Sequence, residues 1–355
     1  MTEVYLLFDC CKIIRGYSRS MILDVQRKVF YFLPNDMLAF IDADGVVKEE
    51  AGSAPLMEFL LEEELAFKCD SNLAHQFIAP KSSTWNYPAR ISNAIVCSRG
   101  FDKEYLESIV HQLTEALQCK YIEFRFEAPL SPSEIEQVIS YLSGLNLFTC
   151  SLCISLQNIS ADLQQLEQLL QNNRRLIKTI VFNYPKELAI SNTTNYGNIF
   201  FTTAKSPALS CGLVSQKLFT LHQSHYNESL LHNTCLNRKI AIGADGSIKN
   251  CPGMAKGYGN IKDTALIDVV NDPEFQKLWH IKKDDIDKCR DCEFRHICTD
   301  CRAFRDDPAN LYSAPLKCGY DPYTGQWEEW STNPLKQSAI DYYGMNELVK
   351  HASKN

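Results

Sequence analysis

The chain has 355 residues, of which 45% are hydrophobic and 22% charged, and its formal net charge is −7 at pH 7. This composition is typical of a globular protein with a sizeable core and excludes wholesale disorder. The acidic balance excludes a nucleic-acid scaffold, which carries a basic face. No apolar run reaches the roughly 18 residues of a membrane-spanning helix, and the first residues lack the basic start of a signal peptide. The sequence therefore predicts a cytoplasmic protein with no nucleic-acid or membrane partner.

Residues 1–85 predict a small mixed α+β domain. Short β-rich runs predict three strands, at residues 4–8, 12–14 and 29–33. A short helix is expected after Pro34, and the apolar stripe of Leu56, Phe59 and Leu60 predicts a second. Residues 82–87 are polar and precede Pro88, so they predict a linker.

Residues 86–215 predict alternating strands and helices. The expected strands lie at residues 94–96, 121–126, 148–156, 177–182 and 199–202. Three helices are expected: the first carries an apolar stripe from Leu106 to Leu117, the second begins at the capping box Ser131–Glu134, and the third begins at Ser160. The first four strand centres lie about 28 residues apart, the size of one βα unit, which predicts a parallel sheet. A segment of this length is about half of a closed barrel of ~250 residues. We therefore expect an α/β fold with a partial, open (β/α) barrel.

The fifteen cysteines are the unusual feature of the composition. Seven of them fall within residues 235–318: Cys235, Cys251, Cys289, Cys292, Cys298, Cys301 and Cys318. In a reducing compartment such spacing indicates metal or cluster ligation rather than disulfides. Residues 216–335 show few apolar stripes, so bound metal would supply folding energy that a core does not. Residues 336–355 predict a C-terminal docking helix.

The spacing alone leaves two kinds of site open. Cys289-x2-Cys292-x5-Cys298-x2-Cys301 lets thiolates converge on one zinc ion or on an iron–sulfur cluster. Upstream, the turn at Gly246 predicts a β-hairpin with Cys235 before its first strand and Cys251 after its second. Seven cysteines exceed the needs of one zinc ion and fall one short of two all-cysteine zinc sites, which favours clusters.

This arrangement resembles the SPASM domain, the auxiliary iron–sulfur module of peptide-modifying radical enzymes. The family pattern is Cys, nine to fifteen residues, Gly, four residues and Cys, then Cys-x2-Cys-x5-Cys-x3-Cys and a final Cys; here the interval before Cys301 is one residue shorter. The resemblance implies two [4Fe–4S] clusters, one held by Cys289, Cys292, Cys298 and Cys318, the other by Cys235, Cys251 and Cys301. The fourth position of the second cluster is left to an open iron site or to one of four candidates: Cys211, His222, His225 and His232.

The motif that binds S-adenosylmethionine in radical enzymes, Cys-x3-Cys-x2-Cys, is missing. After the first expected barrel strand, Cys97 is followed by no cysteine before Cys119, and Asn146 stands where a cysteine would have to precede Cys150 and Cys153. Residues three positions apart in a strand face opposite ways, so we interpret the last pair as buried structural cysteines. Radical S-adenosylmethionine chemistry is therefore not expected, and we expect no S-adenosylmethionine cofactor.

The N-terminal region resembles the start of the grasp-with-spasm SPASM-domain peptide maturases. The resemblance rests on Phe8-Asp9-Cys10-Cys11-Lys12, Ser18-Arg19-Ser20, Asp24-Val25-Gln26-Arg27 and Phe32-Leu33-Pro34. It implies an ATP-grasp peptide ligase as a partner and a precursor peptide as the common substrate, as in graspetide biosynthesis. Residues 1–85 are also similar to the leader-recognition element of peptide-modifying enzymes, in which a leader adds a strand to a sheet edge, here at residues 12–14 or 29–32.

Together these features predict a maturation factor that recognises a precursor peptide and acts with the ligase. One alternative is a redox enzyme that modifies the peptide through the incompletely ligated cluster, and another is a zinc-stabilised binding scaffold. The adjacent Cys10 and Cys11 are expected to face opposite ways along a strand and to serve packing rather than metal binding. His280 and His296 are expected to have surface or packing roles.

Overall fold

The computed structural model describes residues 3–78, 85–157, 173–190, 197–207 and 211–352. The chain divides into two units, one made of residues 1–86, 212–235 and 280–355, the other of residues 87–211 and 236–279. The predicted cluster-binding segment 216–335 thus contributes to both units, and its boundaries stay a prediction. The helix expected after Ser160 and part of the expected linker lie outside the described residues.

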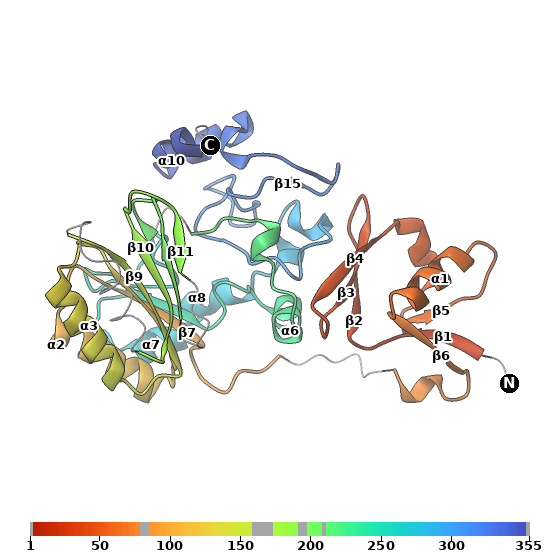
Figure 1. The fold of residues 1–355 in the computed structure, drawn as a ribbon, viewed down its shortest axis with the longest axis horizontal. Helices are drawn as coiled ribbons and strands as arrows, with labels where there is room; N and C mark the ends of the chain where they lie inside the picture. The colour runs from red at the N-terminus through yellow and green to blue at the C-terminus, as the bar shows by residue number, and fades with distance from the viewer. Residues whose placement is uncertain (1–2, 79–84, 158–172, 191–196, 208–210, 353–355) are drawn as a thin grey trace. The chain divides into compact units, whose positions relative to one another are not determined.

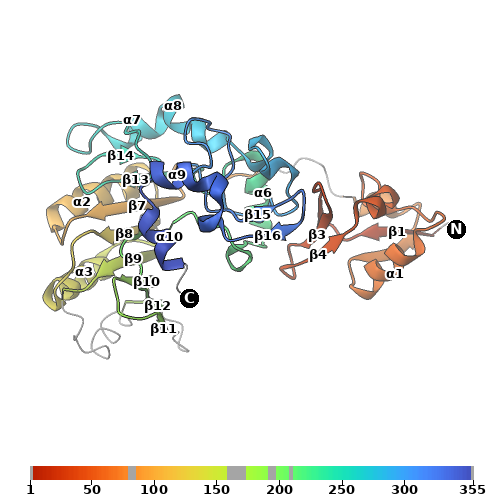
Figure 2. The same ribbon diagram turned by 90° about the horizontal axis from the view of Figure 1, so that it is seen from above.

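A mostly parallel sheet forms the second unit. Its parallel strands are β7 (Asn93–Ser98), β8 (Tyr121–Phe126), β9 (Thr149–Ser155), β10 (Leu176–Phe182), β12 (Asn198–Phe201) and β13 (Lys239–Ile242), and the antiparallel β11 (Leu188–Ile190) and β14 (Ile248–Lys249) lie at its two edges. The strand order is β11-β12-β10-β9-β8-β7-β13-β14 (Figure 2). The predicted α/β class with an open sheet is confirmed.

Helices cover one face of this sheet (Figure 1). They are α2 (Lys103–His111), continued by a π-type turn (Gln112–Ala116), α3 (Pro132–Gly144), α7 (Leu266–Asn271) and α8 (Pro273–Gln276). The predicted start of α3 is confirmed, because Ser131 Oγ accepts the Glu134 N–H at 3.3 Å and the Glu134 carboxylate accepts the Ser131 N–H at 2.8 Å. One buried cluster joins Leu106 and Val138 of the helices to Phe124 and Leu152 of the strands.

Two antiparallel sheets begin the first unit. One has the order β5 (Val46–Val47), β1 (Glu3–Leu7), β6 (Ala66–Asp70) and packs with α1 (Ala54–Glu62); the other has the order β2 (Cys11–Ile14), β3 (Ser20–Asp24), β4 (Val29–Leu33). The sequence analysis missed β3, β5 and β6. All five residues of β3 are buried, so it lacks the alternating polar positions that identify a half-buried strand. The helix expected after Pro34 is a 3₁₀ helix (Asn35–Phe40).

The rest of the first unit consists of short elements. They are α6 (Gln223–Leu231), β15 (Tyr320–Asp321), β16 (Gln326–Trp327), α9 (Gln337–Tyr342), α10 (Asn346–Ala352) and 3₁₀ helices at Ala74–Gln76, Gln216–Leu218, Lys283–Asp285, Cys289–Asp291, Trp330–Thr332 and Pro334–Lys336. A further 3₁₀ helix, Lys277–His280, ends the second unit. Ile340 of the predicted C-terminal helix is fully buried. None of the helices in the described part of the chain is long and apolar enough to cross a bilayer.

The expectation that residues 216–335 lack a core is wrong for the first part of that segment. Ile240, Val269, Phe275 and Trp279 belong to the main core of the parallel sheet. In the other unit, Phe294, Ile297 and Tyr320 pack with Ile14, Met21 and Leu23 of the N-terminal sheet. Apolar contacts with distant parts of the chain therefore supply order that the local sequence pattern does not reveal.

Candidate metal centre

Four of the predicted ligands surround one pocket of the first unit. Cys289, Cys292, Cys298 and Cys318 line it together with Phe219, Phe294 and Trp327. Cys289 begins a 3₁₀ helix (Cys289–Asp291), and Cys318 lies two residues before β15. The structure thus brings together the four residues that the resemblance assigned to one cluster.

Two tight turns present the first three of these sulfurs. Lys288 has a left-handed backbone with φ of 66°, and the Cys292 N–H donates to the Cys289 carbonyl at 3.0 Å. A further turn follows, in which the Cys298 N–H donates to the Phe294 carbonyl at 3.0 Å. The Phe294 N–H donates to Cys292 Sγ at 3.4 Å, a contact that favours the thiolate form.

The spacing of the sulfurs distinguishes the kinds of metal centre. In the described part of the chain, the one trio of possible ligands whose atoms lie within 4.8 Å of one another is Cys10, Cys11 and Asp24. No three of the four pocket sulfurs are that close. A tetrahedral zinc site needs its sulfurs about 3.8 Å apart, whereas a cluster binds each cysteine at a different iron. The pocket therefore fits a cluster better than a single zinc ion.

Burial determines the protonation of these thiols in the absence of metal. Burial raises the pKa of Cys289 to about 12, although the ammonium of Lys283 opposes this effect. The pKa of Cys298 is raised by burial in the same way. Cluster binding at this pocket must therefore release protons, because the ligands are thiolates.

The remaining three predicted ligands are divided between the two units, so a site shared by them is not tested by the structure. The Cys235 N–H donates to Asn233 Oδ1 at 3.1 Å. Cys251 follows the β13–β14 hairpin, which confirms the predicted hairpin at Gly246, but it belongs to the second unit. Cys301 is buried, and a Cβ on Gly212 would lie 2.8 Å from its sulfur. A shared site for Cys235, Cys251 and Cys301 stays a prediction.

Comparison with known proteins identifies part of this region. A family model for SPASM, described as an iron–sulfur cluster-binding domain, matches residues 234–293. These residues form a SPASM segment. The matched residues include four of the seven cysteines, Cys235, Cys251, Cys289 and Cys292, and end before the other three. The match to this domain model implies iron–sulfur binding by the segment.

The whole chain has more distant structural similarities. No curated protein matches its sequence. A crystal structure of Streptococcus suis SuiB bound to S-adenosylmethionine is 11% identical, covering 88% of this chain and 98% of SuiB with a TM-score of 0.38. A second SuiB structure is 12% identical with a TM-score of 0.32, and SuiB bound to its precursor peptide SuiA is 10% identical with a TM-score of 0.30; each covers 84% of this chain and 96% of SuiB.

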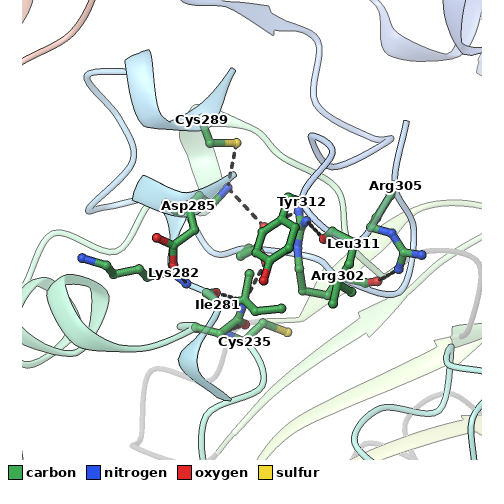
Figure 3. Close-up of polar contacts among 12 residues, drawn as sticks. Cys235, Ile281, Lys282, Asp285, Cys289, Arg302, Arg305, Leu311 and Tyr312 are labelled. Atoms are coloured by element: carbon green, nitrogen blue, oxygen red, sulfur yellow. Dashed lines mark hydrogen bonds and ion pairs between the residues drawn. The ribbon is translucent and has the colours of Figure 1, made fainter. Parts of the chain in front are cut away.

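Buried charged residues within and just beyond the SPASM segment were not predicted. Lys283, Asp300 and Arg302 are all buried, and Arg302 is fully so. The Lys283 ammonium lies 3.4 Å from Cys298 Sγ. Arg302 binds Asp300 through Nε at 2.5 Å and Nη2 at 2.9 Å. It also donates to the Leu311 carbonyl at 2.9 Å (Figure 3). Charged residues are usually exposed, so the sequence offered no signal beyond their nearness to the cysteines.

Cys150, Cys153, Cys10 and Cys11 were expected to serve packing, and one part of that expectation is wrong. Cys150 packs in the main core and Cys153 does not, as alternation along β9 predicts. Cys10, however, precedes β2 rather than lying in it, so its sulfur and that of Cys11 lie within 4.8 Å of each other, contrary to the expectation that they diverge. Asp24, the third member of the trio, already accepts the Arg27 guanidinium at 2.5 Å.

The histidines near the pocket are mainly packing residues. His296 is buried and lies 3.0 Å from Ser229 Oγ, whereas His280 is exposed, as expected for both. His225 of α6 is also buried, and its Nε2 has no hydrogen-bond partner among the described residues. Burial lowers the pKa of His225 to about 4.

His225 predicts that the protein loses stability in mild acid. Between pH 6.5 and 4 the unfolded chain takes up a proton at this residue and the folded chain does not, so stability falls as the pH falls. His225 alone should lower the free energy of unfolding by about 2 kcal/mol between pH 7 and pH 5. In denaturant titrations at the two pH values, His225→Gln should reduce the loss by this amount. His280→Gln, at an exposed position, is the control, and equal losses in all three proteins would contradict the prediction.

Proposed function

We propose that the protein is an iron–sulfur maturation factor for a ribosomally made peptide, which binds the leader of the precursor along β2 and acts with an ATP-grasp ligase. The observation that carries the proposal is an open strand edge beside the cysteine pocket. The ligase is inferred from the sequence resemblance. The SPASM match supports the iron–sulfur part of the proposal.

The hydrogen bonds of β2 show which of its backbone groups are open. The Val25 N–H donates to the Cys10 carbonyl at 3.0 Å, so these opposite residues form a hydrogen-bonded pair. Hydrogen-bonded and non-hydrogen-bonded pairs alternate along two antiparallel strands, so Ile13 and its partner Ile22 form a non-hydrogen-bonded pair. The backbone N–H and C=O of Ile13 therefore point away from β3. Among the described residues, no strand pairs with this side of β2. An open edge of this kind is a template for an added peptide strand.

A groove of about 700 Å³ runs along this edge. Its lining includes Lys12, Ile13 and Arg15, residues 41–45, and a wall of four residues on one face of α6: Gln223, Tyr226, Asn227 and Leu230. Such a groove can accept an extended peptide, whose backbone would pair with β2 while its side chains contact the helix. The wall formed by α6 lies outside residues 1–85, so leader binding requires the full chain rather than the N-terminal domain alone.

The N-terminal hairpin is also bonded to the cysteine loop. Arg19 Nε lies 2.7 Å from the buried Glu293 Oε1, and the Tyr17 N–H donates to the Asp291 carbonyl at 2.8 Å. Arg295 donates to the carbonyls of Arg15 and Cys292, and lines both the groove and the cysteine pocket. A peptide on β2 would therefore lie close to the proposed cluster.

Ile13→Pro tests the proposed edge. Proline removes the outward N–H of Ile13, which β3 does not use, so the sheet should persist and leader binding should weaken at least tenfold, about 1.4 kcal/mol. The measurement is fluorescence anisotropy of the labelled synthetic leader with the full chain. Ile14→Pro is unsuitable, because Ile14 is fully buried and its partner Met21 belongs to a hydrogen-bonded pair.

Phe32→Pro in β4 provides the matched control. By the same alternation, the N–H of Phe32 also points away from β3, on the opposite edge of the sheet. Phe32→Pro should leave the affinity for the leader within about threefold of the parent's, a difference of about 0.7 kcal/mol. A larger loss in Phe32→Pro than in Ile13→Pro would move the site to β4, and unchanged affinity in both would exclude strand addition to this sheet.

A further inference from the structure

A buried lysine faces the sulfurs of the proposed cluster. Lys283 is 4% exposed, and its Nζ lies 3.4 Å from Cys298 Sγ and 3.9 Å from Cys289 Sγ. The same ammonium lies 3.7 Å from Asp300 Oδ1. A lysine is almost never fully buried unless it is paired, so its charge needs a partner inside the protein.

Asp300 by itself does not balance this charge. Both of its oxygens accept hydrogen bonds from Arg302, at 2.5 and 2.9 Å, and Asn233 Nδ2 donates to it at 2.7 Å. Two buried cations, Lys283 and Arg302, thus share one carboxylate. Asn233 also accepts the Cys235 N–H, so these hydrogen bonds extend to a predicted ligand of the second cluster.

The lining of the pocket has the same sign of charge. Three cationic side chains, Lys283, Lys288 and Arg295, line it, and none of the described lining residues is acidic. Of these, Arg295 is paired with Asp284 at 3.0 Å. An excess positive charge in a buried site is costly unless an anion is present. Four thiolates around an iron–sulfur core supply such an anion.

We propose that Lys283 balances the negative charge of the cluster held by Cys289, Cys292, Cys298 and Cys318, and thereby raises its reduction potential. This inference rests on the proposed function, because it requires a cluster in this pocket. One-electron reduction adds a negative charge to the cluster, and a nearby ammonium that donates to its sulfurs stabilises the reduced form. Asp300 holds the ammonium in place, and Arg302 holds Asp300.

Redox titration of the anaerobically purified full chain tests the proposal. The signal of the relevant cluster in electron paramagnetic resonance is identified by its loss in Cys298→Ala. In Lys283→Met, the ratio of reduced to oxidised cluster at the parent's midpoint should fall at least tenfold, which is 59 mV for one electron. Lys282→Met removes the same charge from the neighbouring residue, which does not line the pocket, and should change the ratio less than threefold.

The outcomes separate this inference from the proposed function. Absence of iron and sulfide from the parent protein would contradict the proposed function itself. If Lys283→Met binds the cluster and its midpoint potential equals that of the parent, only the role of Lys283 would be overturned. If Lys283→Met binds no cluster, Lys283→Arg decides: it retains the positive charge and should restore both the cluster and a midpoint potential close to the parent's, and failure to do so would overturn the inference.

Discussion

Cys298→Ala is expected to remove one of the two proposed clusters and to loosen the cysteine-containing part of the first unit. Iron should fall from about eight to about four per chain. Metal ligation contributes roughly 10 kcal/mol in small structural sites, and the loop between Cys289 and Cys298 has few apolar residues apart from Phe294 and Ile297. Limited proteolysis should therefore cut residues 280–335 first.

The same experiment should leave the second unit intact. Ile240, Val269 and Phe275 are held in the core of the parallel sheet without any metal, so residues 236–279 should resist the protease longer. Cys119→Ala is the matched control, because Cys119 is a fully buried cysteine of that core outside the proposed sites. Equal iron content and equal proteolysis of Cys298→Ala and the parent would contradict the assignment of Cys298.

Arg302→Met is expected to lower the free energy of unfolding by about 3–5 kcal/mol, the cost of breaking a buried ion pair. Arg302 is fully buried and donates to both oxygens of Asp300 and to the carbonyls of Leu311 and Ser313, at 2.9 and 2.8 Å. Methionine fills similar volume but leaves these acceptors without their donor. Denaturant titration of the anaerobic protein measures the change.

An exposed pair of the same chemistry provides the comparison. Arg290 lies 2.7 Å from Asp287, but both side chains are about half exposed, at 55% and 49%. Arg290→Met should therefore cost less than about 1 kcal/mol. Similar losses in Arg290→Met and Arg302→Met would show that the buried pair contributes no more than a solvated one.

The parallel sheet could be predicted because its signals are local. The strand at Tyr121–Phe126 alternates apolar and polar residues, and the capping box at Ser131 places the start of α3. In contrast, β3 is buried on both faces and shows no alternation, and the residues of β13 pair with residues of β7 that lie 146 positions earlier in the chain. Pairing between such distant segments depends on tertiary packing, which sequence periodicity does not record.

The candidate site was predicted for a different reason. Cysteine spacing reflects ligand geometry and singled out Cys289, Cys292, Cys298 and Cys301 as a group, and the resemblance to the SPASM domain placed Cys318 with the first three before the pocket was known. The charge environment could not, because Lys283 is indistinguishable from a surface lysine until the fold buries it. The open backbone groups of Ile13 also required the structure, since they follow from the pairing of β2 with β3.

Iron, zinc and acid-labile sulfide analysis of the anaerobically purified protein tests the central claim most directly. Two [4Fe–4S] clusters predict about eight irons and eight sulfides per chain, with a broad brown absorbance. The match of residues 234–293 to the SPASM model and the cationic lining of the pocket both favour this result. Stoichiometric zinc with negligible sulfide would contradict it and would make the protein a zinc-stabilised scaffold.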